Sequence, residues 1–466
     1  MTGGRLTLAD IVDATGARVH PPLDPHAAAV PVRAVSTDTR TLRSGDLFVA
    51  LRGPHADGHR FVGEAAAGGV VGVVVATLPE APLPVPVLLV PDTLRALGVI
   101  AARHRRELRA DVVGITGSVG KTTVAGLTAL VLERRFRVVR SAEAWNAEIG
   151  VPLTLLRAGP ETQVVVAEMA MRGLGQIREL VEIARPRIGV VTNVGESHLG
   201  LLGTVERVAE AKGELVAGLP PEGAAVLNAD DPWTEHLAAK AACRVLRFGL
   251  SPEADVRADR VAAAGSAMTF RLLHGQERAE VRLLLAGRHN VSNALAAAAV
   301  GVLLGVPVEE IGAALAHAVP PSGRLQMEEA GGILIINDTY NASPRSVRAA
   351  LDVLEQVGGG RRRVAVLGDM KELGDASADL HREIGRAAAA RELAVLIAVG
   401  PEAAALAEGA REVMGAERVI HVPDRDGAVP ALRAHLGPTD VVLVKGSRAM
   451  GLEAVVEALR LRVVQR

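Results

Sequence analysis

One stretch of about 25 residues constrains the fold more than any other part of the chain. It reads DVVGIT, then TGSVGKTT, then VAGLTALVLERR, which predicts an apolar strand, a glycine-containing loop and a helix in that order. Gly117 and Gly120 let backbone N–H groups turn toward phosphate oxygens, Lys121 can reach the β- and γ-phosphates, and the Thr122 hydroxyl suits Mg²⁺. The order of elements favours a phosphate-binding loop over a structural glycine turn.

Bulk composition excludes several classes of protein. A chain of 466 residues is too long for one ordinary hydrophobic core, so two to four domains are expected. Hydrophobic residues make up 49% and aromatic residues only 2%, which favours helices packed on sheets over an aromatic-rich sandwich. The formal net charge of −1, without a basic tail, gives no electrostatic support for binding nucleic acid.

Three features of the sequence indicate the cellular compartment. The single cysteine, Cys243, excludes an internal disulfide framework and fits a reducing compartment. No signal peptide is visible at the N-terminus, and the longest apolar runs have only strand length. We therefore expect a cytoplasmic protein with no membrane insertion.

The pattern along the chain predicts an α/β protein of three domains. Residues 1–108 mix short strands and helices and form a small α/β N-terminal domain. Residues 109–322 alternate strands and helices around the phosphate loop, which predicts a central ATPase-like domain with a mainly parallel sheet and antiparallel strands over 254–286. Residues 323–466 alternate again, which predicts a C-terminal Rossmann-like domain without a GxGxxG dinucleotide motif.

Polar residues follow two further strands of the central domain. VVVAE ends in Glu168, and GVVTNVGESH continues into Asn193 and His198. Ligands of a parallel sheet gather at the carboxyl ends of its strands, and a carboxylate with an imidazole is a reasonable ligand set for a metal ion. Taken singly, Glu168 fits a solvated strand end and His198 a loop histidine equally well. Taken together beside a phosphate loop, they favour a functional site.

Lysine is rare in this chain, which draws attention to Lys212. Only five of the 52 basic residues are lysines. The predicted helix that starts at Thr204 carries its apolar residues with one gap, and Lys212 fills that gap on the buried stripe. Such a lysine can extend its ammonium to water, or desolvation can lower its pKa and leave a neutral amine. Residue patterns alone leave both outcomes open.

Several motifs together resemble a known family. TGSVGKTT, Glu168, TNVGESHLG, AEAKGEL, GRHNVSNALAAAA and PPSGRLQ occur in the order seen in the Mur ligases, which build the peptide of bacterial cell-wall precursors. The resemblance covers nearly the whole chain. NAEIGVPLTLL, NDTYNASPRS, LGDMKELG and VKGSRAM point to one member of that family. One departure is visible, because Ala147 stands where family members often have a second asparagine.

The resemblance implies an activity and a set of partners. The expected enzyme uses ATP and two Mg²⁺ ions to join D-alanyl-D-alanine to UDP-MurNAc-tripeptide through an acyl phosphate. It is expected to act as a monomer, with the C-terminal domain closing onto the central one about a hinge near Pro320–Arg324. The third peptide residue is left open between meso-diaminopimelate and lysine.

The resemblance also implies roles for individual residues. The catalytic set is Lys121, Glu168, His198 and Lys212. ATP would contact Thr116, Gly117, Ser118, Val119, Gly120, Lys121, Thr122, Thr123, Asn290, Asn293, Arg324 and Asp338. Metal ligands would be Thr122, Glu168, His198 and Lys212, with Lys212 acting as a CO₂-derived carbamate. Substrate contacts would come from Asp38, Thr39, Arg40, Asn146, Asn341, Ser343, Asp369 and Arg448.

Some of these residues also fit simpler roles. Asp338 and Asp369 follow strands and fit turn positions, Asn290 fits a helix cap, and Arg448 could pair with any surface acid. Competing functions are the preceding Mur ligase, which adds the third peptide residue, and a phosphate-loop NTPase acting as a switch or binding module. The preceding ligase usually carries a DNPR-like motif, which this sequence lacks.

Overall fold

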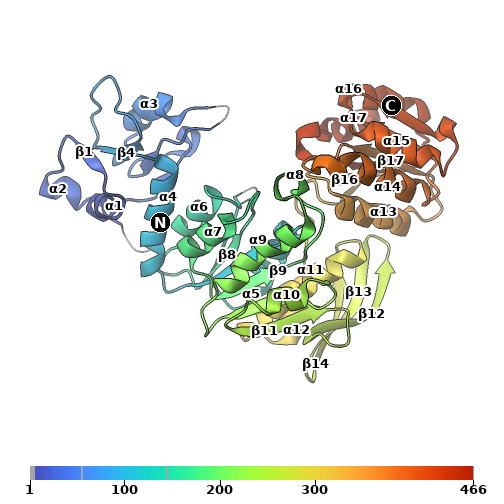
Figure 1. Cartoon of the computed structure of the whole chain (residues 1–466), viewed down its shortest axis with the longest axis horizontal. Helices are drawn as coiled ribbons and strands as arrows, with labels where there is room; N and C mark the ends of the chain where they lie inside the picture. Colours follow the sequence, from blue (N-terminus) through green and yellow to red (C-terminus); the bar gives the residue numbers. More distant parts are fainter. Residues whose placement is uncertain (1–5, 54–55, 143–144, 465–466) are drawn as a thin grey trace.

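Three sheets stand in a row along the molecule (Figure 1). The structure is a computed structural model that describes residues 6–53, 56–142 and 145–464. Within those residues, no helix combines the length and the apolar character needed to cross a membrane. The α/β class and the arrangement in three domains are both present.

The N-terminal sheet has the order β1-β5-β4-β3-β2 and is parallel except at β1. Its strands are β1 (Arg18–His20), β2 (Val35–Ser36), β3 (Leu47–Val49), β4 (Gly72–Val75) and β5 (Val87–Leu89). Helices α1 (Leu8–Thr15), α2 (Pro25–Ala28) and α3 (Val62–Ala67) belong to the same unit. Helix α4 (Thr93–Glu107) contacts α1 and also the central helices α6 and α7, so one apolar core runs through both units.

The central sheet has nine strands in the order β14-β13-β12-β11-β10-β9-β6-β8-β7. Its parallel part comprises β6 (Asp111–Thr116), β7 (Val138–Arg140), β8 (Val164–Glu168), β9 (Ile188–Val191), β10 (Ala224–Asn228) and β11 (Arg244–Gly249). The strands β12 (Val256–Ala264), β13 (Ala267–His274) and β14 (Glu277–Leu283) form an antiparallel meander at one edge. The antiparallel strands expected over 254–286 are therefore present.

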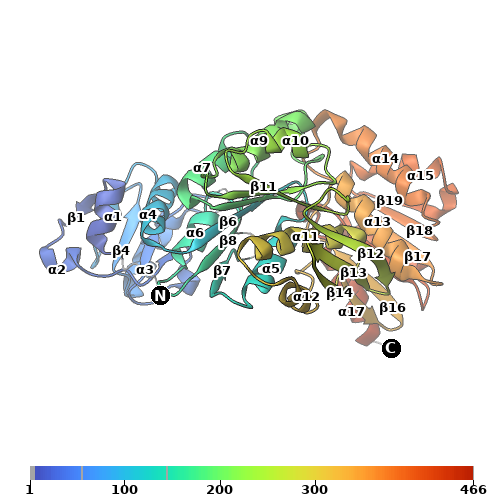
Figure 2. The same cartoon turned by 90° about the horizontal axis from the view of Figure 1, so that it is seen from below.

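Helices cover both faces of the central sheet, because its strands are apolar on both sides (Figure 2). One face packs against α5 (Lys121–Leu132), α11 (Arg288–Leu303) and α12 (Val308–Leu315). The other face packs against α6 (Gly150–Leu156), α7 (Gln176–Ala184) and α9 (Val205–Ala217), with α8 (Leu199–Leu202) and α10 (Thr234–Ala238) beside them.

The C-terminal sheet has the order β15-β16-β20-β17-β18-β19 and is parallel except at β15. Its strands are β15 (Gln326–Ala330), β16 (Ile333–Asp338), β17 (Arg363–Gly368), β18 (Val395–Val399), β19 (Val419–Val422) and β20 (Val441–Lys445). Helices α13 (Pro344–Gly358), α14 (Ser377–Ala389) and α15 (Ala403–Arg411) cover one face. Helices α16 (Arg425–His435) and α17 (Glu453–Val464) cover the other, which gives the expected doubly wound unit.

Candidate active site

The phosphate loop joins β6 to α5 and depends on two glycines. Gly117 has φ +149°, and a Cβ there would lie 1.9 Å from Thr192 Oγ1. Gly120 has φ +88°, and a Cβ there would lie 2.5 Å from Asn293 Oδ1. Lys121 folds back and donates from Nζ to the Gly117 carbonyl at 2.8 Å. The two glycines thus let the loop backbone pass close to the Thr192 and Asn293 side chains, where a larger residue would clash.

The end of β9 holds the loop in this shape. Thr192 Oγ1 donates to the Val119 carbonyl at 2.6 Å, and Asn193 Nδ2 donates to the same oxygen at 2.9 Å. The Val119 N–H donates to Asn193 Oδ1 at 3.1 Å, and the Ser118 N–H donates to the Asn193 carbonyl at 3.0 Å. Thr192 was not predicted as a site residue, because its place at the end of a strand was the only signal and only the tertiary structure shows that β9 lies beside β6.

Glu168 reaches the loop from the end of β8. It is only 4% exposed, and its two carboxylate oxygens accept from Thr122 Oγ1 at 2.8 Å and from Asn146 Nδ2 at 3.0 Å. Its backbone N–H donates to Ser141 Oγ at 3.0 Å, which fixes the end of the strand. A buried carboxylate beside the phosphate-loop threonine offers hard oxygen donors of the kind that Mg²⁺ prefers.

A second domain contributes to the same place. Arg324 Nη2 donates to Thr122 Oγ1 at 2.9 Å, and its guanidinium stacks over the Tyr340 ring at 4.0 Å from the centroid. Asp338 accepts from the Leu325 N–H at 3.1 Å and pairs with Lys445 Nζ at 2.6 Å. Arg324 therefore connects the C-terminal domain directly to the phosphate loop.

Lys212 lies on the buried face of α9 and is 2% exposed. Within the described residues its ammonium has no hydrogen-bond or ion-pair partner. Desolvation lowers its pKa well below the usual lysine range, and the nearby positive charge of Lys121 lowers it further. Desolvation also lowers the pKa of Lys121, and Arg324 adds to that effect while Glu168 opposes it.

His198 lies at the N-terminus of α8 and pairs with the other domain. Its Nδ1 is 2.6 Å from Glu372 Oε2. Although these two atoms are close, they do not form an aligned hydrogen bond. Among the described residues, no three His, Cys, Asp or Glu side chains gather as a ready metal centre.

The asparagine motif starts α11 beside the loop. Asn290 Nδ2 donates to the Ala286 carbonyl at 2.7 Å, and Asn293 Nδ2 donates to Asn290 Oδ1 at 2.9 Å. Burial lowers the pKa of the neighbouring His289 to about 4. The backbone contact of Gly120 with Asn293 shows that this motif belongs to the phosphate-loop site.

The expected substrate residues lie in different domains. Asp38 caps the turn Thr39–Thr41 and pairs with Arg40 in the N-terminal domain. Ser343 caps α13, and the neighbouring Asn341 carbonyl accepts from Lys445 Nζ at 2.8 Å. Arg448 is exposed, 5.9 Å from the Tyr340 ring.

Asp369 has a structural environment that the sequence could not reveal. It is fully buried, accepts from the Ala403 N–H at 2.8 Å and pairs with Lys371 Nζ at 2.8 Å. Lys371 also pairs with Glu402 at 2.7 Å. These contacts tie the loop after β17 to the start of α15.

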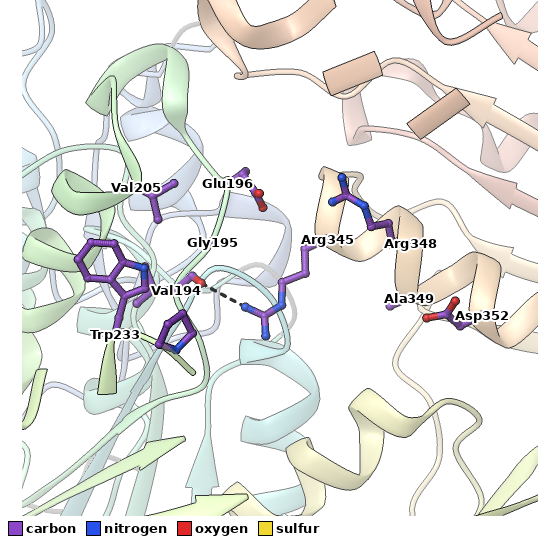
Figure 3. A pocket seen from close by; sticks show the side chains of 10 residues that line it. Val194, Gly195, Glu196, Val205, Trp233, Arg345, Arg348, Ala349 and Asp352 are labelled. Atoms are coloured by element: carbon purple, nitrogen blue, oxygen red, sulfur yellow. Dashed lines mark hydrogen bonds between the residues drawn. The ribbon is translucent and has the colours of Figure 1, made fainter. Parts of the chain in front are cut away.

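A cavity of about 520 Å³ lies between the central and C-terminal domains (Figure 3). Arg345, from α13, points across it and donates to the Val194 carbonyl at 3.1 Å. The same guanidinium is 3.5 Å from the buried Asp231 carboxylate. Trp233 lines the opposite wall, and a second cavity of about 550 Å³ continues along α13 past Asp352. The domain interface is thus only partly closed, and sequence reasoning missed Arg345 because its partner is 114 residues away.

Fold and site together define a three-domain α/β protein whose nucleotide loop is completed by residues from a second domain. Three family models match the chain: "Mur ligase family, catalytic domain" over residues 31–105, "Mur ligase middle domain" over 115–301 and "Mur ligase, glutamate ligase domain" over 323–448. The chain therefore belongs to the Mur ligase family, and the predicted resemblance is confirmed.

Curated relatives extend over nearly the whole chain. A UDP-N-acetylmuramoyl-tripeptide–D-alanyl-D-alanine ligase of Mycobacterium tuberculosis is 40% identical over 97% of both chains. One of Escherichia coli is 38% identical over 93% of this chain and 95% of its own. Among solved structures, a crystal structure of MurF from Acinetobacter baumannii has a TM-score of 0.90 at 32% identity, covering 99% of this chain and 100% of its own. MurF from Thermotoga maritima in complex with ADP has a TM-score of 0.82 at 27% identity, covering 95% and 100%.

Proposed function

We propose that this chain is the ATP-dependent ligase that joins D-alanyl-D-alanine to UDP-MurNAc-tripeptide. The full-length relatives that carry this name support the proposal, as does the Thermotoga relative with bound ADP. We place the reaction in the cytoplasm, where ATP is supplied, and expect the enzyme to act as a monomer.

One observation carries the proposal. The Thr122 hydroxyl, at the end of the phosphate loop, is contacted by Glu168 of the central domain and by Arg324 at the start of the C-terminal domain. A nucleotide bound here would lie between two domains. A second domain at the phosphates suits an enzyme that must bring a phosphoryl group, a carboxylate and an amine together.

The chemistry is a two-step activation. The terminal carboxylate of the tripeptide attacks the γ-phosphorus of ATP, which forms an acyl phosphate and releases ADP. The amine of D-alanyl-D-alanine then attacks the acyl carbon, and the tetrahedral intermediate expels phosphate and leaves the amide. No protein nucleophile is required, so Lys121 and Arg324 contribute by positioning the phosphates and stabilising negative charge.

The chain also offers groups that would hold Mg²⁺. Thr122 and Glu168 supply a hydroxyl and a buried carboxylate at 2.8 Å from each other, which fits a hard cation. His198 is a candidate ligand of a second ion, together with a carbamate on Lys212. A neutral amine without a partner is the form that reacts with CO₂, losing a proton to become an anionic oxygen ligand. Bound Mg²⁺ would neutralise charge that develops on the transferred phosphoryl group.

The remaining candidate residues divide between the two ends of the substrate. Asp38, Thr39 and Arg40 would face the UDP end from the N-terminal domain. Asn341, Ser343 and Arg448 would face the peptide and the incoming dipeptide, with Asp369 behind them. Asn146 would act through Glu168, whose carboxylate it contacts.

The decisive assay measures phosphate release from ATP with each substrate supplied alone and together. We expect release only when UDP-MurNAc-tripeptide and D-alanyl-D-alanine are both present, and a product whose mass equals the UDP-MurNAc-pentapeptide. Tripeptides ending in meso-diaminopimelate and in lysine should both be tried. ATP hydrolysis indifferent to D-alanyl-D-alanine would favour an NTPase switch, and extension of UDP-MurNAc-dipeptide by one amino acid would favour the preceding ligase.

A further inference from the structure

The central and C-terminal domains meet at a second place, away from Arg324. There the segment from His198 to Leu202 contacts the loop that follows β17. The Gly200 N–H donates to the Glu372 carbonyl at 2.9 Å. A Cβ on Gly374 would lie 2.8 Å from Gly200 Cα, so the two backbones touch without room for a side chain. This is a closely fitted contact rather than a chance approach of two surfaces.

Both titratable residues at this contact have left-handed backbones. His198 has φ +56° and Glu372 has φ +67°. Such a conformation costs a non-glycine residue about 1–2 kcal/mol, so it persists only where the surroundings impose it. Strain of this kind is concentrated at functional sites.

The loop that carries Glu372 is held rigidly from behind. The Lys371 N–H donates to Ser447 Oγ at 2.8 Å, and the Lys371 ammonium pairs with both Asp369 and Glu402. The Ser447 N–H donates to the Asp369 carbonyl at 3.1 Å. These contacts fix the backbone that carries Glu372. A residue that orients another side chain needs such a fixed backbone.

Glu372 contacts only one nitrogen of the His198 imidazole. Nδ1 of His198 is paired with Glu372 Oε2 at 2.6 Å, while Nε2 has no hydrogen-bond partner among the described residues. A neutral imidazole that donates its Nδ1–H to a carboxylate keeps the Nε2 lone pair for a metal ion, and Glu372 lies close enough to Nδ1 to accept that hydrogen bond once ring and carboxylate align.

We infer that Glu372 is a positioning residue for His198, supplied by the C-terminal domain to orient the imidazole for metal binding. The inference rests on the proposed function, in which His198 is a metal ligand. Its consequence is that one metal site reaches full affinity only when the C-terminal domain is docked against α8. Domain closure and metal binding would then stabilise each other.

The test uses the full-length protein with Mn²⁺ in place of Mg²⁺, a non-hydrolysable ATP analogue and bicarbonate. The concentration of free Mn²⁺ is measured by electron paramagnetic resonance. We expect Glu372→Gln to weaken one Mn²⁺ site by roughly 10–100-fold while the affinity for the analogue at saturating Mn²⁺ is retained. Glu372→Asp, which keeps the charge, should recover part of the loss. Asp375→Asn removes an exposed charge three residues away, with no partner in the described residues, and should bind as wild type does.

His198→Gln separates the two proposals. Wild-type Mn²⁺ binding in Glu372→Gln, with weakened binding in His198→Gln, overturns the positioning role and leaves the proposed function intact. Wild-type binding in both variants overturns the positioning role and also the assignment of His198 as a ligand. Equal weakening of Mn²⁺ binding in Glu372→Gln and Asp375→Asn would show that loss of any nearby negative charge lowers the affinity. That result would also overturn the inference.

Discussion

At the scale of single residues, the structure adds most to the interpretation of Lys212. The sequence placed it on an apolar stripe but left open whether its ammonium reaches water. Its 2% exposure, together with the absence of any hydrogen-bond or ion-pair partner in the described residues, leaves the ammonium almost wholly desolvated. Lys240 differs from Lys212, because its aliphatic stem packs against α9. A Cβ on Gly213 would lie 2.6 Å from Lys240 Cδ.

Replacement of Lys212 tests the need for an amine. Lys212→Arg cannot form a carbamate, so we expect the ligase rate to fall by roughly 10²-fold or more while the far-UV circular dichroism spectrum is kept. Short carboxylic acids should partly restore Lys212→Ala by supplying the missing anion. Lys240→Arg is the matched control and should remain active. Full activity in Lys212→Arg would contradict the carbamate.

His289 should make the central domain sensitive to acid. Its pKa is about 4 in the folded state and 6.5 as a free histidine, because burial disfavours the charged ring. Between these values the unfolded chain binds the extra proton, so stability is complete above pH 6.5 and is lost as the pH falls toward 4. The ring keeps part of its surface exposed, so we expect a loss of about 1–3 kcal/mol.

Urea unfolding at pH 7.5 and 4.5, followed by tryptophan fluorescence, measures this loss. Both tryptophans of the chain, Trp145 and Trp233, lie in the central domain and therefore report on it. His289→Gln should show a smaller decrease in unfolding free energy than wild type. His26→Gln, on an exposed helix of the N-terminal domain, should decrease as wild type does. Equal decreases in wild type and His289→Gln would show that His289 is not the group responsible.

At the scale of elements, the phosphate loop was predictable because its signal is local. Strand, glycines, lysine and helix are contiguous in the chain, and each favours the same conformation. What closes the loop was not predictable, because Thr192 and Asn193 follow a strand more than 70 residues later. The antiparallel strands over 254–286 and their place at the edge of the domain were likewise predictable from the sequence, whereas the pairing of β12 with β11 in one nine-stranded sheet required tertiary contacts.

Alanine substitutions at two glycines separate loop geometry from helix stability. In Gly117→Ala the new Cβ would fall 1.9 Å from Thr192 Oγ1, so the loop must distort, and we expect nucleotide binding measured by calorimetry to weaken at least roughly tenfold. Gly126→Ala lies in α5 with only the Arg140 guanidinium nearby, at 3.6 Å. That control should bind nucleotide normally and gain up to about 1 kcal/mol of helix stability. Normal binding in Gly117→Ala would argue against a tightly closed loop.

At the scale of the whole molecule, side-chain contacts at several points set the angle between the central and C-terminal domains. They include Arg324 with Thr122, Glu372 with His198, Arg345 with Val194 and Asp231, and Gln356 with Gly265 and Gly287. Two cavities along α13 remain between them, which leaves space for further closure. The linker at the predicted hinge contains Gly323 with φ +61° and Leu325 with φ +51°, so its backbone is sharply turned.

Arg345→Ala should loosen this arrangement. It removes the hydrogen bond to the Val194 carbonyl and the pairing with Asp231, so we expect small-angle scattering to show a larger radius of gyration without ligands. Arg348→Ala is the control, because Arg348 pairs with Glu383 inside the C-terminal domain. Substrates with an ATP analogue should compact the wild type. Identical scattering from both variants and wild type would show that Arg345 does not set the domain angle.

The sequence by itself determined the α/β class, the phosphate loop and the buried position of Lys212, because each rests on periodicity or spacing within one segment. Tertiary structure decided which distant side chains complete the site: Asn146 and Thr122 on Glu168, Arg324 on the loop, and Glu372 on His198. The physical reason is that hydrogen bonds and ion pairs depend on distances of about 3 Å between atoms, and local sequence patterns carry no information about which distant segments come that close.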